Sequence, residues 1–451
     1  MSADVGLVND HAVSERGAAG RRGLLIAGVA VAAVAAIAYI VALATHPADK
    51  LLNGFDLSVY LGGAGQALHH PGDLYSWTYK GHPGIQFTYT PFAALLFALG
   101  RVLSLRVLLG LVAVVSTFSL LATVWIAFRE LGWRSLATRT GATLLVGGLM
   151  FWTEPVQRGL YLGQVELALM AVVVWDMCQP DSRKWKGAAT GIAAGIKLVP
   201  ALFILYLLVT RRFREAFVGI GAFVVTVIIG FAVLPGPSGP YWFEGNFFQA
   251  SRTGFVGVFQ NQSLRGLLTR LIGSVNGAMA PWLIVAVVVV VAGLAAAVLL
   301  HNAGYEFAGL MACALTALLV SPISWDHHWV WIAPGLALII DVAVRARGGA
   351  RALWLALGGA VLVVYGAWPD FWSATAGLLH GGLINYAPAS SFAHGDNPHY
   401  AEYHWHGLQL IAGNLYLLGG LALFVIMLAA AFYVARTRGG VTRLLRAAPA
   451  E

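Results

Sequence analysis

The stretch from His46 to Phe87, HPADKLLNGFDLSVYLGGAGQALHHPGDLYSWTYKGHPGIQF, separates two apolar segments and is too long and polar for a tight turn. Within it, Asp56 stands in an apolar, aromatic and glycine-rich setting. From Asp56 to Gln66 apolar residues recur at helical spacing, which predicts a short helix on a membrane surface. A turn is expected at Asp73–Tyr75, where the chain re-enters the membrane. We interpret the remaining chain as a membrane frame that holds Asp56 over a cavity.

The composition is that of a polytopic membrane protein. The chain of 451 residues is 59% hydrophobic and 11% charged, whereas a soluble domain has about 25% charged residues. The net charge of +8 comes from arginines that gather near the ends of apolar segments, where they set orientation. No nucleic-acid partner is therefore expected, because no soluble basic domain is present. The two cysteines, Cys178 and Cys313, have no metal-ligand spacing and indicate no disulfide framework.

The apolar runs predict an all-α membrane protein with about twelve transmembrane helices. The predicted spans are 24–44, 88–104, 107–127, 140–153, 160–177, 188–209, 216–234, 278–300, 306–320, 329–344, 353–369 and 410–434. The first span is too long for the apolar part of a signal peptide, so we interpret it as uncleaved.

Charge predicts that both ends of the chain lie in the cytoplasm. The expected location is the plasma membrane, which the chain crosses many times. Arginines flank the first and last spans, and further arginines at 211–214 and 345–351 fall on the same side. The count of twelve places the basic residues of 129–139 and 183–186 outside, against this trend. Spans 88–104 and 140–153 are also short, which favours broken or re-entrant helices in this region.

The predicted organisation is one transmembrane domain, 24–434, between a cytoplasmic tail, 1–23, and a basic cytoplasmic tail, 435–451. Three long loops, 45–87, 235–277 and 370–409, are expected on the outer side. A turn cluster at Pro235–Pro240 opens the second loop. We find no internal repeat and no separate soluble domain.

Ionisable groups in or beside the membrane are functional candidates, because burying them is costly. Each has an alternative role. Lys197 and Arg158 would also suit snorkelling to the headgroup layer, and Glu154 and Arg158 would also suit a simple helical ion pair. The other polar candidates are Gln164, Asn261, Gln262, Arg265, Asp326, His327 and His328.

Three of these candidates, Asn261, Gln262 and Arg265, would also suit capping and positioning a helix. Asp56 is the strongest candidate, because its sequence neighbours include no basic residue. No metal site is expected. Beside Asp326, the neighbouring histidines His327 and His328 would rarely ligate one ion alone, and no third ligand is evident. The histidines at 394–406 are more typical of a wet polar rim.

Six motifs in order resemble the GT-C-type, polyprenyl-phosphate-sugar-dependent glycosyltransferases of actinobacterial envelopes, family 87. They are Gly54–Tyr60 with Asp73–Tyr75, Gly163–Glu166, Lys197–Pro200, Asn261–Leu264 and Ser321–His328. Each motif is weak alone, but the ordered set is specific. The stretch from His394 to Tyr416 further resembles the branch that adds α-1,2-linked mannose to phosphatidylinositol mannosides.

The resemblance implies a GT-C fold and a mannosyltransferase whose donor is polyprenyl-phosphate mannose. Asp56 is then the base that takes the proton of the acceptor hydroxyl. The leaving phosphate must be met by fixed donors, for which Lys197, Arg265, His327 and His328 are available. The substrate-binding candidates are Tyr60, Tyr75, Glu154, Arg158, Gln164, Asn261, Gln262, Trp325 and Asp326. The aromatic members would also suit an interfacial belt.

The expected partners are this lipid-linked sugar donor, a glycolipid acceptor and membrane lipids, and no cofactor is expected. Two alternatives remain open from the sequence. One is a lipid or sugar transporter, for which broken helices and a midplane lysine are also suitable. The other is an enzyme of the same kind that uses polyprenyl-phosphate arabinofuranose.

Overall fold

A computed structural model describes residues 4–81, 84–249, 252, 254–368, 381–390 and 397–446. Seven helical segments there are long and apolar enough to cross a membrane, or eight if the bent pair α6–α7 counts as one span. The chain is therefore an all-α polytopic membrane protein, as predicted, but the count of twelve spans is not confirmed. The seven are α1 (Asp4–Thr45), α4 (Leu105–Glu130), α10 (Phe213–Val233), α13 (Met279–Asn302), η6 (Asp326–Trp331) with α15 (Ile332–Arg345), α16 (Gly348–Tyr365) and α18 (Leu415–Arg446).

Shorter helices complete the architecture. They are α2 (Phe55–His69), α3 (Pro91–Gly100), α5 (Leu136–Phe151), α6 (Glu154–Leu162), α7 (Glu166–Met177), α8 (Ala188–Ile196), α9 (Ala201–Val209), α11 (Pro235–Trp242), α12 (Leu264–Ile272), α14 (Glu306–Val320) and α17 (Leu408–Ala412).

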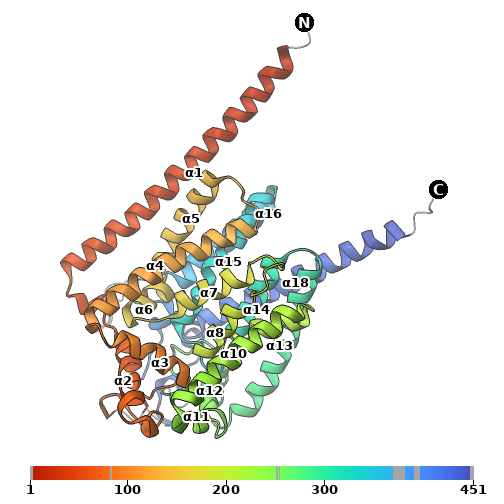
Figure 1. Ribbon diagram of the computed structural model, residues 1–451. Coiled ribbons are helices and arrows are strands. Elements are labelled where there is room, and N and C mark those ends of the chain that lie inside the picture. Colours follow the sequence, from red (N-terminus) through yellow and green to blue (C-terminus); the bar gives the residue numbers. More distant parts are fainter. Residues whose placement is uncertain are drawn as a thin grey trace.

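The helices run between two faces of the molecule (Figure 1). We call one the basic face, which holds the ends of α4, α7, α9, α13 and α15 and the starts of the helices that follow them. The other, the cavity face, carries α2, α3, α11 and α12, which lie together at the opposite end of the bundle. The helix α1 packs parallel to α5, because Gly28 lies against Gly141 and Val31 against Gly148. The start of α5 and the neighbouring part of α1 are thus both at the basic face.

The chain bends by 116° between α6 and α7. Gly163 ends α6 with a φ of 73°, a left-handed conformation that glycine adopts without a steric penalty. The bend leaves Gln164 at the corner, on the cavity face. The predicted span 160–177 is therefore not one straight helix.

The predicted span 188–209 is also wrong as a single crossing, because it is a re-entrant pair of helices. α8 leaves the basic face alongside α10, since Gly187 lies against Glu215 and Gly195 against Thr226. The helix stops at Lys197, which is extended, and Pro200 then begins α9. α9 returns to the basic face. Each helix has 9 residues, or about 13 Å at 1.5 Å per residue, so neither is long enough to span a bilayer.

Local sequence explains the tip of this pair. A β carbon on Gly195 would lie 2.1 Å from Thr226 Oγ1, so α8 can approach α10 this closely only because the residue is glycine. The Thr90 hydroxyl donates to the carbonyl of Gly195, and thereby satisfies a helix-end acceptor that has no partner within α8. The break at Lys197 is thus held by contacts to two other segments.

The helix predicted in this loop is confirmed as α2, and its buried side includes Val59, Tyr60, Gly63 and Ala67. The backbone amide of Gly54 donates to the carbonyl of Tyr161, with an N–O distance of 2.8 Å, which fixes the start of α2 against the end of α6. The following predicted span, 88–104, is reduced to α3, a helix of 10 residues that packs on α2.

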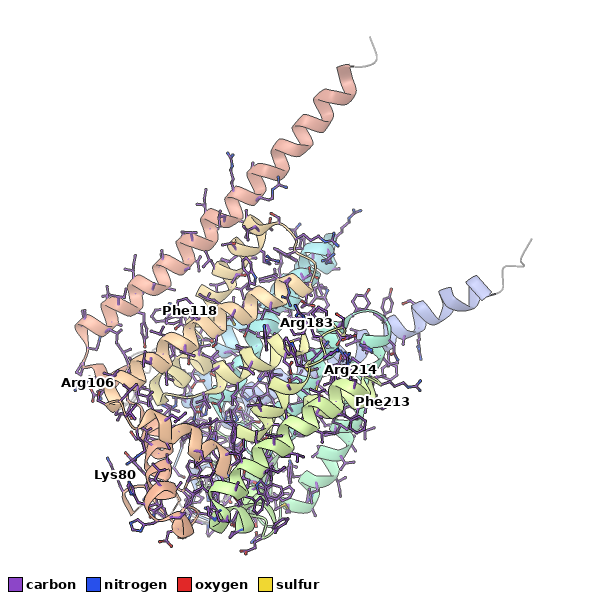
Figure 2. All side chains as sticks on the ribbon, viewed as in Figure 1. Lys80, Arg106, Phe118, Arg183, Phe213 and Arg214 are labelled. Carbon is purple, nitrogen blue, oxygen red and sulfur yellow. The ribbon has the colours of Figure 1, made fainter. Side chains whose placement is uncertain are left out.

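The prediction that residues 129–139 and 183–186 lie opposite the other basic segments is wrong. Arg129 donates to the carbonyl of Cys178 (3.1 Å) and Arg345 to that of Leu131 (2.7 Å). Arg214 donates to the carbonyl of Asp181, and Figure 2 shows Arg183 and Arg214 close together. All these segments therefore share the basic face. The error follows from counting two segments as crossings that are not: span 88–104, which is only α3, and span 188–209, which is the re-entrant pair. Every loop between these two segments is thereby placed on the wrong side.

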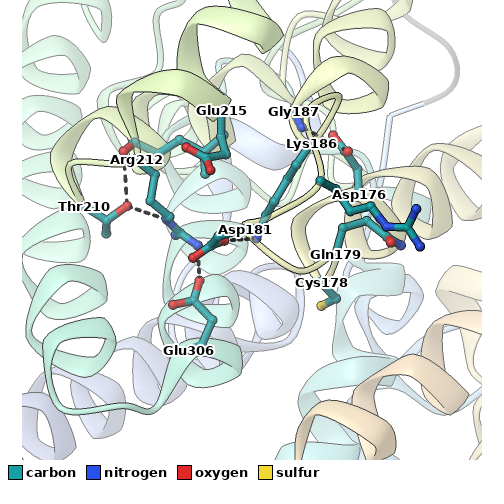
Figure 3. A network of polar contacts seen from close by, with 12 residues as sticks. Asp176, Cys178, Gln179, Asp181, Lys186, Gly187, Thr210, Arg212, Glu215 and Glu306 are labelled. Atoms are coloured by element: carbon teal, nitrogen blue, oxygen red, sulfur yellow. Dashed lines mark hydrogen bonds and ion pairs between the residues drawn. The ribbon is translucent and has the colours of Figure 1, made fainter.

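A network of polar contacts holds this face together (Figure 3). Arg212 Nη1 lies 2.6 Å from Glu306 Oε1 and joins the start of α10 to the start of α14. Asp176 accepts hydrogen bonds from the backbone amides of Gly187 (3.0 Å) and Thr190 (2.9 Å) and thereby caps α8. Both ends of the re-entrant pair are thus fixed at the basic face.

The three predicted loops contain short helices rather than irregular chain alone. Loop 45–87 holds α2, loop 235–277 holds α11 and α12, and loop 370–409 holds two short 3-10 turns, Leu383–Tyr386 and Ala401–His404. His394 lies outside the described residues. His404 Nε2 and His406 Nδ1 both lie within hydrogen-bond distance of backbone carbonyls, at 2.9 and 3.0 Å.

This arrangement predicts which exposed positions share a side of the membrane. In a Cys178→Ser background, single cysteines at Arg183 and Arg347 should both be labelled by an impermeant thiol reagent from one side. A cysteine at Lys80 should be labelled from the other side. The comparison uses intact cells and inverted vesicles. Labelling of positions 183 and 347 from opposite sides would contradict the re-entrant pair.

Candidate active site

A cavity of about 580 Å³ opens between the irregular segments of the cavity face. Its wall is formed by the start of α2, the segment 84–89, the α6–α7 bend, the α8–α9 break, residues of 241–249, Arg252, and the segments 254–260 and 317–328. Nine of the predicted residues line it. They are Asp56, Tyr60, Arg158, Gln164, Lys197, Trp325, Asp326, His327 and His328.

Asp56 lies on the first turn of α2 and is half-buried. Gln164 Nε2 donates to Asp56 Oδ2, and Gln164 Oε1 accepts from the Tyr60 hydroxyl at 2.7 Å. Burial raises the pKa of Asp56, while the charges of His327, Arg158 and Lys197 and the Gln164 hydrogen bond oppose this rise. The carboxylate is thus oriented by a neutral amide and has no salt bridge among the described residues.

Lys197 has an acidic partner that lies 31 positions away in the sequence. Its Nζ contacts Glu166 Oε1 at the start of α7 and lies 3.0 Å from His328 Nε2. Lys197 has no acid within helical reach in the sequence. Its acidic partner is Glu166, because the start of α7 packs beside the break between α8 and α9. Lys197 therefore has a protein carboxylate as a partner and also lines the cavity.

Asp326 and His327 form a second polar group. Asp326 Oδ1 accepts from the backbone amide of His327 at 2.7 Å and lies 3.1 Å from His327 Nδ1. Arg158 Nε lies 4.0 Å from Asp326 Oδ2. His327 is 3% exposed, and its Nε2 has no hydrogen-bond partner among the described residues. This nitrogen is therefore available to a ligand in the cavity.

Glu166, His327 and His328 are the one group of potential metal ligands among the described residues, with ligand atoms within 4.8 Å of one another. Glu166 is thus the third ligand that the sequence did not reveal. However, Lys197 Nζ contacts both Glu166 and His328. A cation at this position would compete with the ammonium for the same atoms, so the donor set fits Lys197 better than a metal ion.

Glu154 lies behind the cavity wall rather than in it. The side chain is 1% exposed and accepts a hydrogen bond from the Tyr416 hydroxyl at 3.1 Å. Its expected ion pair with Arg158 is not formed within the distance of a salt bridge, because Arg158 faces Asp326 instead.

Asn261 and Gln262 hold neighbouring backbone segments rather than capping a helix, because the N-cap of α12 is Ser263. Asn261 Nδ2 donates to the carbonyls of Val256 (2.8 Å) and Pro322 (3.2 Å), and its Oδ1 accepts from the amide of Ser324 (3.0 Å). Gln262 Nε2 donates to the carbonyl of Gly413 at 2.7 Å. Neither residue lines the cavity.

Arg265 and Tyr75 also lie outside the cavity lining. The Arg265 guanidinium lies over the Trp282 ring, 5.2 Å from its centroid, and is not placed to join Lys197 in one clamp. Tyr75 donates to the carbonyl of Tyr89 at 2.9 Å and stacks on Tyr241. Tyr75 thus supports the wall.

Sequence reasoning missed several residues that the fold brings into the cavity. They are Tyr89, Tyr241, Gln249, Arg252 and Gln260. Gln260 immediately precedes the Asn261–Leu264 motif, which was a usable signal. Arg252 lies in a loop without periodicity or a motif, so its position depends entirely on the fold.

Comparisons with known proteins agree on one family. The model of glycosyltransferase family 87 matches residues 87–322. A Mycobacterium tuberculosis (strain CDC 1551) protein named polyprenol-phosphate-mannose-dependent alpha-(1-2)-phosphatidylinositol pentamannoside mannosyltransferase is 33% identical over 74% of this chain and 80% of its own length. A protein of the same name from Mycolicibacterium smegmatis is 33% identical over 68% of this chain and 74% of its own.

A further relative from Mycobacterium tuberculosis (strain H37Rv) is named polyprenol-phosphate-mannose-dependent alpha-(1-2)-phosphatidylinositol mannoside mannosyltransferase. It is 31% identical over 62% of this chain and 67% of its own length. No solved structure gave a significant match.

The Asn261 contacts predict that this residue is needed for the stability of the site. Asn261→Ala removes three hydrogen bonds and leaves buried backbone groups without partners, each at a cost of about 1–3 kcal/mol. The melting temperature of the purified protein in detergent should therefore fall clearly. Asn302→Ala, at the exposed end of α13, is the matched control and should melt like the wild type. Equal melting of both variants would contradict this role.

Proposed function

The chain belongs to glycosyltransferase family 87, and we propose that it transfers mannose from polyprenol-phosphate mannose to a mannose hydroxyl of a phosphatidylinositol mannoside, forming an α-1,2 linkage. The observation that carries this function is the position of Asp56, a carboxylate held by Gln164 in the same cavity as Lys197 and the two histidines. The relatives' names support the donor, the acceptor and the linkage.

The chemistry requires one base and a site for the leaving phosphate. In the proposed reaction, the acceptor hydroxyl oxygen forms a bond to the anomeric carbon of mannose as the bond from that carbon to the phosphate oxygen breaks. The hydroxyl proton passes to Asp56. Polyprenyl phosphate leaves as an anion, so no acid has to protonate it. Because the attack inverts the anomeric carbon, a β-linked donor gives an α product.

The leaving phosphate is best placed beside Lys197, His327 and His328. Lys197 supplies positive charge, and His327 Nε2 is open to the cavity. Fixed donors of this kind stabilise charge that develops during the reaction. Arg265, which lies outside the cavity, has no part in this clamp. With the charge met by protein groups, the proposed mechanism needs no cofactor.

The membrane orientation follows from charge. The basic face collects the arginines of several loops, so we place it in the cytoplasm of a plasma-membrane protein. Both termini then lie inside, and the active site lies at the outer face. The wall of the cavity includes Phe247 and Phe248, and Phe248 is 70% exposed. An apolar margin of this kind suits donors and acceptors whose tails stay in the bilayer.

Purified protein without a membrane gradient should convert polyprenol-phosphate mannose and a phosphatidylinositol mannoside into a heavier glycolipid. Asp56→Asn keeps the shape of the side chain but cannot take a proton, so turnover should fall by about 10²–10⁴. Asp73→Asn, in an exposed turn of the same loop, is the matched control. Normal turnover of Asp56→Asn would remove Asp56 from the base role. Transfer of arabinofuranose in place of mannose would overturn the donor assignment.

The raised pKa of Asp56 predicts an acid limb in the pH profile. The base acts only when deprotonated, so kcat/KM should rise with pH through the pKa of Asp56. Since burial raises that pKa, the midpoint should lie above the ordinary value of about 4. The limb should persist in the slower His327→Gln variant. A midpoint at or below about 4 would contradict the assignment, and so would loss of the acid limb in His327→Gln.

A further inference from the structure

Three basic side chains, Arg158, Lys197 and Arg252, line the cavity among the described residues, and they differ in their partners. Lys197 contacts Glu166, and Arg158 lies 4.0 Å from Asp326. Arg252 has no acidic partner within the described part of the chain. Its positive charge is therefore the one in the cavity wall that no carboxylate of the described residues neutralises.

The Arg252 guanidinium is held in place from one side. Its Nη2 donates to the carbonyl of Tyr75, and its central carbon lies 5.5 Å from the centroid of the Tyr75 ring. Tyr75 is itself fixed by its hydrogen bond to Tyr89 and its stacking on Tyr241, with ring centroids 5.2 Å apart. The backbone carbonyl of Arg252 accepts from the amide of Gln86 at 3.4 Å.

Among the described residues, this attachment leaves most of the guanidinium available. Arginine carries five N–H donors, and the contact to Tyr75 uses one of them. A planar guanidinium with neighbouring free donors matches two oxygens of a phosphate. The surrounding wall is aromatic and apolar, with Tyr241, Phe247 and Phe248. The combination suits an anion that is attached to a lipid.

The position of Arg252 separates it from the reacting centre. Its contacts are to Tyr75 and Gln86. Asp56 contacts Gln164 instead, and Lys197 contacts His328. The phosphate of the donor is bonded directly to the carbon under attack, so it must lie near Asp56. The phosphate of a phosphatidylinositol mannoside is separated from the reacting hydroxyl by sugar rings, so it must lie farther away.

We propose that Arg252, oriented by Tyr75, is a second phosphate subsite that binds the phosphodiester of the lipid acceptor. The subsite rests on the proposed function for the identity of the acceptor. It divides the cavity into a donor phosphate position at Lys197 and the histidines and an acceptor phosphate position at Arg252. The acceptor hydroxyl then reaches Asp56 beside the bound donor. The sugar rings of the acceptor set the distance between this hydroxyl and the phosphodiester at Arg252.

The test compares Arg252→Gln with Arg101→Gln in purified full-length protein. Arg101 is a matched control, because it also donates to a backbone carbonyl, that of Leu61, but is exposed and does not line the cavity. Equilibrium binding is measured with a phosphatidylinositol mannoside, with a neutral alkyl mannoside that lacks the phosphodiester, and with polyprenyl phosphate. Melting temperatures confirm that each variant is folded.

Arg252→Gln should weaken binding of the phosphatidylinositol mannoside about 10- to 100-fold, as expected for loss of a charge-assisted hydrogen bond. Binding of the neutral mannoside and of polyprenyl phosphate should stay within about twofold, and Arg101→Gln should bind all three like the wild type. In turnover, the KM for the acceptor should rise more than kcat falls.

Three results would overturn the subsite. Weaker binding of polyprenyl phosphate alone would place Arg252 at the donor. An equal loss for the charged and the neutral mannoside would show a structural role, whether it is measured in Arg252→Gln or, if that variant does not fold, in the milder Arg252→Lys. Unchanged binding throughout would exclude any contact. These binding measurements need no turnover, so they test the subsite separately from the proposed reaction. If the proposed reaction is wrong, the wild type would bind the lipids but transfer no mannose.

Discussion

The ion pair between Lys197 and Glu166 is the constraint on which the active site depends. Each residue stands at a break in a helix, Lys197 at the end of α8 and Glu166 at the start of α7. An unpaired charge in such an interior is costly, and removing one partner of a buried pair leaves the other uncompensated. The pair therefore fixes the two breaks relative to each other. Irregular backbone at membrane depth is tolerated where protein surrounds it or where it lines a cavity, and here both breaks form the cavity wall.

The acids of the site differ in their partners. Glu166 is occupied by Lys197, and Asp326 is occupied by His327 with Arg158 nearby. Asp56 is held by the amide of Gln164, which orients the carboxylate without a salt bridge. A carboxylate that is buried without a salt bridge gains affinity for a proton. Of the two acids that line the cavity, Asp56 is thus the one suited to act as a base.

The basic face determines the position of Lys197 from a distance. Asp176 caps the start of α8, and the Arg212–Glu306 pair holds the segment that follows α9. Both ends of the re-entrant pair are thereby fixed. The lengths of α8 and α9 then set how far the tip with Lys197 lies from the basic face. Small residues along α8 allow its close contact with α10. The polar network in Figure 3 thus supports a site at the opposite face of the molecule.

The sequence by itself determined the class of protein, the helix that carries Asp56 and nine of the residues that line the cavity. Composition and apolar runs are local properties, and the α2 pattern of Val59, Tyr60, Gly63 and Ala67 is a local periodicity. Four of the six ordered motifs contribute residues to the cavity, and each could be found because it is short and contiguous. Asn261 and Gln262 were recognised as polar, but whether they face a ligand or the backbone could not be read from their order.

The tertiary structure alone decided the re-entrant path of α8 and α9, the partner of Lys197 and the presence of Arg252 in the cavity. A hydropathy pattern reports that a segment is apolar, and a broken pair that returns to its own side has the same pattern as a crossing. Glu166 and Lys197 are 31 positions apart, and Arg252 and Tyr75 are 177 apart. The energy of these contacts depends on distance in space and on exclusion of water, and packing between helices sets both of these quantities.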